Sequence, residues 1–398
     1  GYSTINGGGG KDTISNTAAK VSINGGAGND TLKGGAIMTG AAGSDVFVYE
    51  KGAVTITDYT ANADKISLSG KNLSNASDVA ISGKNIILGF GSDSLTITNG
   101  KDKKVAFVNG KTTTQYIFGE DVIFNTGKTA ATLISSATNF NASNYSSMVT
   151  IDATKTKSAT NIIGNTTANK IYAGAKGSTL NGGKGNDTLV GGAGVDVFVY
   201  GKNTGNDVIQ NYTSGTDKIS IGSASISAFS INNAGDAVLK IGSNTLTLKK
   251  VGNENISTNG KRVTLIDANG KETTRTYYKD KIVEGSGVTL TSAFKSKSYT
   301  AGTGIVTVDA AQVTTALALN GNELANVLTS GKGTDTLKGG AGNDNLIGSA
   351  GDDKIFLASG SIDKVMMSGS NVTFNVGSNS ITLTDLELDV DYSMIVGG

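Results

Sequence analysis

Side chains that carry oxygen, chiefly aspartate and asparagine and once serine, recur at a fixed spacing in three parts of the sequence. The spacing is 18 residues, and it separates Asp12 from Asp30, Asn169 from Asp187, Ser178 from Asp196, Asn326 from Asp344, and Asp335 from Asp353. All five pairs lie in glycine-rich sequence, where glycine accepts a positive φ and lets backbone carbonyls turn inward. Carboxylate and carbonyl oxygens suit Ca²⁺, which takes about six to eight of them. A single turn cannot supply that number, so the chemistry requires two turns brought together by stacking.

Apolar residues indicate the strands that must position these acids. Nine-residue units recur over 7–48, 164–199 and 321–356, and a six-residue slip after Lys33 interrupts the first run. The eighth position of every unit is a large apolar residue: Ile14, Ile23, Leu32, Phe47, Ile171, Leu180, Leu189, Phe198, Leu328, Leu337, Leu346 or Ile355. A flexible glycine-rich linker has no reason to keep this phase, so each unit is predicted to be a turn followed by a short strand of a solenoid.

A longer period of 157 residues carries Asp30 onto Asp187 and Asp344. It divides the chain into module 1 (1–131), truncated on its N-terminal side, module 2 (132–288), and module 3 (289–398), truncated on its C-terminal side. The segments flanking the nonapeptides, such as 58–68, 91–98 and 132–153, alternate apolar and polar residues and are punctuated by turn sequences. This alternation predicts antiparallel hairpins.

The nonapeptide pattern GGxGxDxUx, where U is a large apolar residue, resembles the hemolysin-type calcium-binding repeats of the RTX family. The hairpin-rich flanks resemble modules of large bacterial secreted surface, adhesin or surface-layer proteins. The resemblance implies an all-β fold in which short parallel β-roll segments (7–48, 164–199 and 321–356) alternate with antiparallel hairpins. Two nonapeptides would make one coil, so like turns would stack on one edge every 18 residues.

The same resemblance implies several bound Ca²⁺ ions and indicates their ligands. The expected side-chain ligands are Asp12, Asp30, Asp45, Asn169, Asp187, Asp196, Asn326, Asp335, Asp344 and Asp353. The turn glycines expected around the ions are Gly8, Gly10, Gly26, Gly28, Gly183, Gly185, Gly192, Gly194, Gly331, Gly333, Gly340, Gly342 and Gly351. The pairs Asp12/Asp30 and Asp335/Asp353 are the strongest predicted sites, Ser178 makes a poorer one, and the slip places Asp45 out of phase. The alternative is that these residues only shape turns, which applies most to Asn169, Ser178 and Asn326.

The composition excludes several other functions. The chain has no His, Cys, Pro or Trp, which removes the commonest general base, thiol chemistry and disulfides. Zinc-protease HExxH and Ser-His-Asp arrangements are therefore impossible, and no GxSxG sequence occurs. We predict that the chain is not an enzyme. The net charge of +1 does not favour nucleic acid, and no apolar run is long enough to span a membrane.

These observations predict a secreted calcium-binding structural protein of the bacterial cell surface or extracellular matrix. Type I secretion and folding on calcium outside the cell are implied by the resemblance. The tail 385–398, which is acidic and then apolar, resembles a C-terminal export signal. The predicted partner is a second copy of the chain, in a filament or layer with head-to-tail strand complementation, and cell-surface glycans are a further candidate partner. The alternatives are a stalk segment of a large adhesin and a C-terminal secretion or folding domain of an enzyme or toxin.

Overall fold

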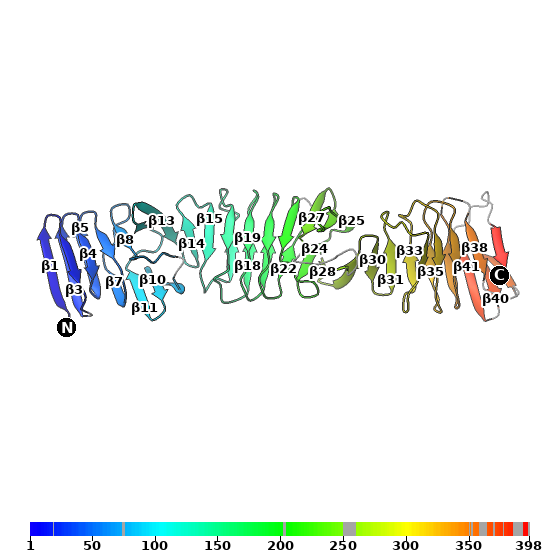
Figure 1. The fold of residues 1–398 in the computed structure, drawn as a ribbon, viewed down its shortest axis with the longest axis horizontal. Coiled ribbons are helices and arrows are strands. Elements are labelled where there is room, and N and C mark those ends of the chain that lie inside the picture. Colours follow the sequence, from blue (N-terminus) through cyan, green and yellow to red (C-terminus); the bar gives the residue numbers. More distant parts are fainter. Residues whose placement is uncertain are drawn as a thin grey trace. The chain divides into compact units, whose positions relative to one another are not determined.

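The computed structural model describes residues 1–18, 20–73, 76–201, 204–249, 260–349, 351, 353–357, 364–368, 371–376, 378–384 and 393–396 (Figure 1). These residues contain β-strands and no α-helix, which confirms the all-β prediction. The chain forms two compact units: Gly1–Tyr212 with Ser243–Leu246, and Thr213–Gly242 with Thr247–Gly398. The three-module division stays a prediction from the sequence. Of the predicted export tail at 385–398, only 393–396 lie within the described residues.

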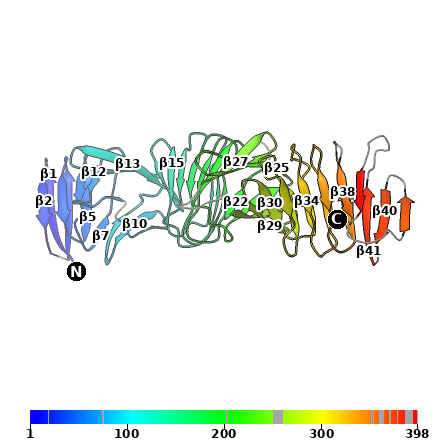
Figure 2. The ribbon, with the colours of Figure 1, turned by 45° about the vertical axis from the view of Figure 1, so that its right-hand side comes forward.

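The first unit begins with a two-sheet parallel roll (Figures 1 and 2). One sheet contains β1 (Ser3–Gly9), β3 (Val21–Ala27), β5 (Ile37–Ala42) and β7 (Ala53–Ile56). The other contains β2 (Thr13–Asn16), β4 (Thr31–Gly34), β6 (Val46–Val48) and β8 (Lys65–Ser67). Neighbouring strands are parallel in both sheets. The chain thus passes from one sheet to the other at every turn, and the roll extends beyond the nonapeptide run 7–48.

Antiparallel strands enter this roll as insertions. Strands β9 (Asp78–Ser82), β10 (Asn85–Phe90) and β11 (Asp93–Ile97) form a meander, and β11 then pairs in parallel with β7. Strand β12 (Lys104–Asn109) pairs in parallel with β8 and begins a second meander with β13 (Thr112–Phe118) and β14 (Val122–Asn125). The hairpin predicted around 91–98 is therefore confirmed. The segment 58–68 is instead part of a parallel coil, so its hairpin prediction is wrong.

A second parallel roll completes the first unit. One of its sheets contains β15 (Ala130–Leu133), β17 (Thr150–Asp152), β19 (Lys170–Tyr172), β21 (Thr188–Val190) and β23 (Asp207–Gln210), and the other contains β16 (Asn139–Asn141), β18 (Thr160–Ile163), β20 (Ser178–Asn181) and β22 (Val197–Val199). Strand β15 pairs antiparallel with β14 on one side and in parallel with β17 on the other, and β16 pairs in parallel with β18. The hairpin predicted over 132–153 is therefore confirmed only at β15, and the strands after it are parallel. Alternation with period two marks a strand but does not give the direction of its partner.

The second unit contains the third roll. Its longer sheet includes β24 (Lys218–Gly222), β28 (Lys261–Asp267), β29 (Glu272–Tyr277), β30 (Lys281–Glu284), β31 (Gly287–Leu290), β33 (Thr307–Asp309), β35 (Val327–Thr329), β37 (Asp344–Ile347), β41 (Asn379–Thr384), β40 (Asn371–Val376) and β39 (Lys364–Ser368). Facing it are β32 (Ser298–Thr300), β34 (Ala318–Asn320), β36 (Thr336–Lys338), β38 (Lys354–Leu357) and β42 (Ser393–Val396). Strands β25 (Ile226–Ile231) and β26 (Ala237–Ile241) form an antiparallel pair, and β27 spans Asn244–Leu248.

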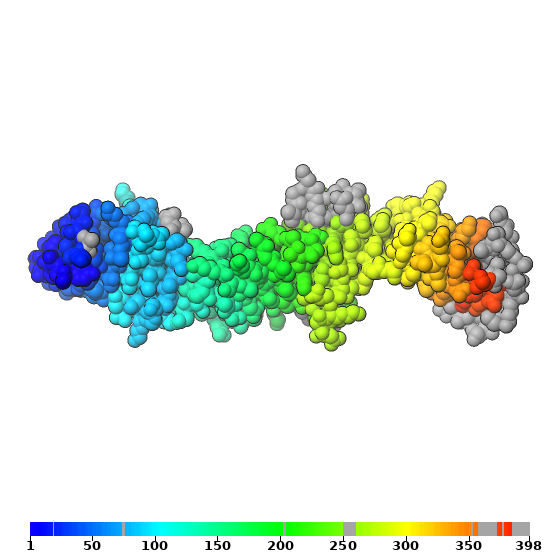
Figure 3. All heavy atoms as spheres, turned by 90° about the horizontal axis from the view of Figure 1, so that it is seen from below, coloured from blue at the N-terminus to red at the C-terminus, as the bar shows by residue number. Residues whose placement is uncertain are grey.

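The apolar residue at the eighth position of each nonapeptide forms the core. Eleven of these twelve side chains are buried, and Ile14 is partly buried against the same core. Within each unit the colour in Figure 3 changes steadily along the chain, because each coil packs on coils that are near it in sequence. The strand prediction for the nonapeptides is therefore confirmed, and the sheets bring their turns into stacks.

Candidate metal centres

The five pairs spaced by 18 residues stack as predicted. In each pair the backbone N–H of the first residue donates to Oδ1 of the second. The N···O distances are 2.8 Å for Asp12/Asp30, 2.7 Å for Asn169/Asp187, 2.7 Å for Ser178/Asp196, 2.8 Å for Asn326/Asp344 and 2.9 Å for Asp335/Asp353. Each carboxylate thus holds the turn of the preceding coil, and the acids form ladders along the edges of the rolls.

The first ladder continues through Asp45, so the prediction that Asp45 is out of phase is wrong. The N–H of Asp30 donates to Oδ1 of Asp45 at 2.9 Å, across only 15 residues. The coil is shorter because the chain reverses tightly after β4, where Gly34 and Gly35 have φ values of 75° and 79°. The shorter turn on the opposite edge of the roll offsets the six-residue slip after Lys33, so Asp45 stacks beside Asp30 in the ladder.

Two further acids extend the ladders and were missed in the sequence. The N–H of Asp45 donates to Oδ1 of Asp64, and the N–H of Asp187 donates to Oδ1 of Asp207, both at 2.9 Å. Asp207 follows Gly205 and Asn206, so its Gly-Asn-Asp sequence was an available signal. Asp64 has no glycine turn before it, and its coil of 19 residues departs from the expected spacing.

We name a turn open when the second oxygen of its acid, Oδ2, is buried and has no hydrogen-bond partner among the described residues. Five acids meet this definition: Asp12, Asp30, Asp45, Asp187 and Asp344. The residue four positions before each has a positive φ, namely Gly8 (104°), Gly26 (102°), Ala41 (68°), Gly183 (94°) and Gly340 (97°). An open turn therefore contains an anionic oxygen that the protein itself does not satisfy.

We name a turn closed when the residue four positions before the acid donates its N–H to the acid's side chain. The donors are Thr60 to Asp64, Gly192 to Asp196, Thr213 to Asp217, Gly331 to Asp335, and Ser349 to Asp353, at 2.7 to 3.1 Å. Asn165 and Asn322 donate in the same way to Oδ1 of Asn169 and Asn326. The side-chain amides of Asn169 and Asn326 also donate, to the carbonyls of Met148 and Ile305 respectively. A carboxylate in their place could not donate.

Glycine borders the unpartnered oxygen in every open turn. A side chain on Gly25 would place its Cβ 2.3 Å from Oδ2 of Asp30, and one on Gly182 would place it 2.1 Å from Oδ2 of Asp187. A Cβ on Gly7 would lie 2.6 Å from Oδ2 of Asp12 and 2.3 Å from the carbonyl oxygen of Gly25, in the next turn. Side-chain and carbonyl oxygens from two stacked turns thus border one space that only glycine leaves open.

These donors fit Ca²⁺, which prefers hard oxygen ligands from carboxylates and carbonyls. Among the described residues no group of three or more acidic side chains is positioned to hold a metal, so backbone carbonyls would supply much of the coordination. Close stacking places backbone carbonyl oxygens of one turn against the glycines of the next. A Cβ on Gly26 would lie 2.0 Å from the carbonyl oxygen of Gly8, and a Cβ on Gly28 would lie 1.9 Å from the carbonyl oxygen of Gly10.

The predicted turn glycines are needed for two different reasons. Ten of the thirteen have a positive φ, and Gly192, Gly194 and Gly331 do not. A Cβ at these three would lie 1.9 Å from the Gly174 oxygen, 2.0 Å from the Gly177 nitrogen and 2.2 Å from the Val313 oxygen, respectively. They are required by close backbone approach, and all three lie in closed turns. Their metal-binding role, like that of the other predicted site residues, stays a prediction.

Burial raises the pKa of several ladder acids. The pKa of Asp187 rises to about 7, chiefly through burial and also through the charge of Asp207, while the N–H of Asn169 opposes the rise. Burial raises the pKa of Asp207 to about 6. It also raises the pKa of Asp45 and Asp344, against the effect of N–H donors from Asp30 and Asn326. The protein does not fully compensate these charges, and a cation would.

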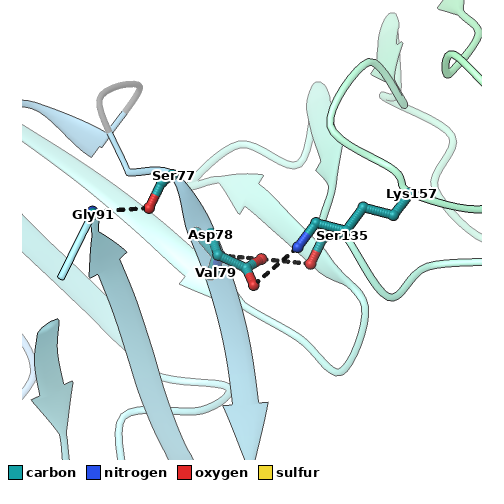
Figure 4. Close-up of polar contacts among 6 residues, drawn as sticks. All are labelled: Ser77, Asp78, Val79, Gly91, Ser135 and Lys157. Atoms are coloured by element: carbon teal, nitrogen blue, oxygen red, sulfur yellow. Dashed lines mark hydrogen bonds and ion pairs between the residues drawn. The ribbon is translucent and has the colours of Figure 1, made fainter. Parts of the chain in front are cut away.

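A separate polar cluster joins Asp78 of β9 to Ser135 and Lys157 (Figure 4). The Ser135 hydroxyl donates to Oδ1 of Asp78, and Nζ of Lys157 lies 3.3 Å from Oδ2. The Ser135 bond and the Lys157 charge lower the pKa of Asp78. A carboxylate with a lowered pKa is a poor general base, so the cluster ties the β9 meander to the second roll and does not activate the serine.

Stacked parallel strands whose turns hold unpartnered carboxylate oxygens form a β-roll with the kind of oxygen donors that Ca²⁺ prefers. The chain carries four copies of the RTX calcium-binding nonapeptide repeat, matched at residues 1–18, 22–36, 163–198 and 320–361. Calcium-binding repeats of this kind therefore make up part of the chain. Such repeats are typical of proteins exported by type I secretion. Among the described residues no helix is long and apolar enough to cross a membrane.

No curated protein matches the chain. Among solved structures, the crystal structure of the extracellular lipase LipA from Serratia marcescens is similar at 15% identity, with a TM-score of 0.17. The match covers 63% of this chain and 45% of the lipase chain, so it spans less than half the length of that protein. A TM-score this low supports no argument about function.

Proposed function

We propose that the chain is a secreted structural protein of the bacterial cell surface or extracellular matrix, and that its open turns hold Ca²⁺. The observation that carries the proposal is the set of five buried Oδ2 atoms without partners. A buried anionic oxygen without a partner is costly, and five of them at equivalent places call for a common counter-ion. Bound calcium would neutralise these oxygens and link turns of successive coils.

The open turns give an order of preference among the sites. Asp12, Asp30 and Asp45 are consecutive members of one ladder, so their shared edge is the strongest candidate. Asp187 and Asp344 each follow a Gly-Asn pair, as Asp30 does. The closed turns of Asp335 and Asp353 satisfy both oxygens with protein donors, so we rank this pair below the open turns.

The proposed location is supported by the same chemistry. Extracellular calcium modules bind with dissociation constants of about 10⁻⁴ to 10⁻³ M, a range that cytosolic calcium does not fill. The chain has no cysteine, so it gains no stability from disulfides outside the cell. Calcium links between turns would take that role, and the folded state would form where calcium is available.

Calcium titration of the purified chain tests this proposal. We expect far-UV circular dichroism to show gain of β-structure, and the melting temperature to rise, between about 0.1 and 5 mM Ca²⁺. Equal concentrations of Mg²⁺ are the control, because Mg²⁺ sheds its waters reluctantly and should leave both signals nearly unchanged. Identical spectra and melting temperatures with calcium and with chelator would contradict the proposal.

Self-association into a filament or layer is part of the proposal. The net charge of +1 supports it, because little electrostatic repulsion keeps copies apart. Light scattering and negative-stain microscopy in calcium should show assemblies that chelator disperses. A chain that stays monomeric in calcium at all concentrations would favour the stalk role and exclude the filament.

A further inference from the structure

Asp58 lies outside the nonapeptide pattern, in the turn between β7 and β8, and its carboxylate contacts the preceding coil. Oδ1 of Asp58 accepts the N–H of Gly40 at 2.9 Å, and Oδ2 accepts the N–H of Ala41 at 2.6 Å. Both donors belong to the open turn of Asp45. Asp58 therefore contacts a candidate calcium turn, although it is not one of the predicted ligands.

The N–H of Ala41 is the group that would close this turn. Ala41 lies four positions before Asp45, and in the closed turns the N–H at that position donates to the acid, as Gly192 does to Asp196. In this turn the N–H donates to Asp58 instead. Oδ2 of Asp45 is left buried and without a partner among the described residues. A donor is thus present at the right position, and Asp58 takes it.

The conformation of Ala41 fits the same explanation. Its φ of 68° is left-handed, which is unfavourable for a residue with a Cβ. Successive backbone N–H groups can form a concave arrangement that binds an anion when one residue of the turn is left-handed. The N–H groups of Gly40 and Ala41 hold the Asp58 carboxylate in this way. Two hydrogen bonds to a charged acceptor offset the unfavourable φ.

The second roll repeats this part of the sequence with one relevant difference. Residues 40–48 read GAAGSDVFV and 191–199 read GGAGVDVFV, and the next coils contain DYT at 58–60 and NYT at 211–213. Asn211 thus stands in the place of Asp58, and its Nδ2 donates to the Gly191 carbonyl at 3.5 Å. There Gly192 has no left-handed φ, and its N–H donates to Oδ2 of Asp196 at 2.7 Å. The closed turn has an amide where the open turn has a carboxylate.

The two coils also differ in length. Asp58 lies 18 residues after Gly40, and Asn211 lies 20 residues after Gly191. A comparison of the two rolls therefore combines a change of side chain with a change of loop. Substitution of Asp58 alone separates the two, because it leaves the length of the coil unchanged.

We propose that Asp58 is a positioning residue for calcium, which holds the turn of Asp45 open by accepting the N–H of Ala41. Without Asp58 that N–H turns to Oδ2 of Asp45, and the turn closes as that of Asp196 does. Asp58 acts through the backbone of Ala41 and needs no contact with the ion. The role in calcium binding rests on the proposed function, whereas the exchange of hydrogen bonds does not.

Asp58→Ala in the full chain tests the calcium role. We expect isothermal titration with Ca²⁺ to show one ion fewer per chain than in the wild type. The melting temperature should fall clearly in saturating calcium and much less in chelator, because Oδ2 of Asp45 gains a donor and Ala41 leaves its unfavourable conformation. A residue that only braced the turn would lower the melting temperature by the same amount in both conditions.

Asn211→Ala is the matched control in the second roll. The turn of Asp196 is already closed by the N–H of Gly192. The variant should therefore bind as many Ca²⁺ ions as the wild type, and any change in melting temperature should be the same in calcium and in chelator.

A second readout needs no calcium. In chelator, Ala41→Gly should raise the melting temperature of the wild type, because glycine accepts a left-handed φ. The same substitution should not raise it in the Asp58→Ala chain, where Ala41 is no longer held in that conformation. Asp58→Asn keeps one acceptor oxygen and should lie between the wild type and Asp58→Ala in both readouts. It keeps the test decisive if Asp58→Ala fails to fold.

Several outcomes would overturn the inference. One is an Asp58→Ala chain that binds as many Ca²⁺ ions as the wild type, and another is an equal fall in melting temperature with calcium and with chelator. A lost ion combined with an unchanged effect of Ala41→Gly would make Asp58 a ligand and end its positioning role. If the wild type binds no Ca²⁺, the proposed function fails. The effect of Ala41→Gly then still decides whether Asp58 holds the turn open.

Discussion

At the scale of single residues, the position four before the acid separates the open turns from the closed turns. A positive φ there accompanies an unpartnered Oδ2, as with Gly183 before Asp187. Where φ is not positive, the N–H donates to the acid, as Gly192 does to Asp196. Glycine occurs in both turns, so the motif alone cannot distinguish them. The difference lies in one backbone conformation, and it decides whether Oδ2 of the acid has a protein donor.

Asparagine substitutions should separate the two kinds of turn. In calcium at about a hundredfold excess over Kd, Asp187→Asn should lose about 2 to 3 kcal/mol of unfolding free energy, because one calcium site is lost. In chelator the same change should be neutral or stabilising, because it removes a buried, uncompensated charge. Urea unfolding in both conditions measures the difference.

The matched control is Asp196→Asn, in a closed turn. It disturbs the bond from Gly192, so we expect a similar cost with calcium and with chelator. The distinction between open and closed turns would be wrong if Asp196→Asn lost the calcium response and Asp187→Asn kept it.

Ala41 occupies an open-turn position where the other four open turns have glycine. Its φ of 68° is left-handed, which costs a residue with a Cβ about 1 kcal/mol. Ala41→Gly should therefore raise the unfolding free energy by about 1 kcal/mol. As a control, Ala27→Gly in β3 should lower it by about 0.5 to 1 kcal/mol, because glycine weakens a strand. Equal effects of the two substitutions in thermal unfolding would argue against strain at Ala41.

The raised pKa values predict an unusual pH dependence in calcium-free protein. The pKa of Asp187 is about 7 in the folded chain and about 4 when unfolded, so the folded state binds this proton more tightly. Its contribution to stability is present below about pH 4 and is lost as the pH rises to about 7. Urea midpoints of calcium-stripped protein between pH 5 and 8 should fall, and Asp187→Asn should make the slope shallower. A slope identical in wild type and variant would exclude Asp187 as its source.

At the scale of elements, the nonapeptide strands and their stacking could be predicted because each unit repeats the same apolar position. Coil length could not be predicted, because it depends on turns of the opposite edge that contain no motif. The reversal at Gly34 and Gly35, for example, restores Asp45 to its ladder. Strand direction over 132–153 was also hidden, because apolar alternation is the same for parallel and antiparallel neighbours.

The metal ligands could be predicted only in part for the same reason. Spacing identified the stacked pairs, since a carboxylate and an N–H in equivalent turns must meet when coils stack. Spacing could not reveal Asp64, whose coil has 19 residues. It also could not show that the turn of Asp335 is closed whereas that of Asp187 is open. That separation depends on where a single N–H points, and similar glycine motifs allow both directions.

The core of the rolls depends on the eighth position of the nonapeptide. Leu189 in β21 is almost fully buried, and its replacement by alanine should cost about 2 to 5 kcal/mol of unfolding free energy. Ile14 in β2 is only partly buried, so Ile14→Ala should cost clearly less. Chemical denaturation in saturating calcium measures both. Equal costs would show that the position does not carry the stability of the roll.

At the scale of the whole molecule, bound calcium would link the turns of successive coils in a chain that has no cysteine for disulfides. Among the residues that the structure describes, open turns occur at three successive coils of the first roll and once in each of the other two rolls. The second and third rolls place theirs at Asp187 and Asp344, which lie at the 157-residue period from Asp30. Under the proposed function, stabilisation by calcium would recur with the 157-residue period, while the closed turns would hold their coils without an ion.

The most direct test of this account is a crystal structure of the chain grown in calcium, with an anomalous difference map. The account predicts calcium peaks at about 2.3 to 2.6 Å from Oδ2 of Asp12, Asp30, Asp45, Asp187 and Asp344, and none beside Asp196, Asp335 and Asp353. Peaks at the closed turns with none at the open turns, or no calcium at any ladder acid, would contradict it.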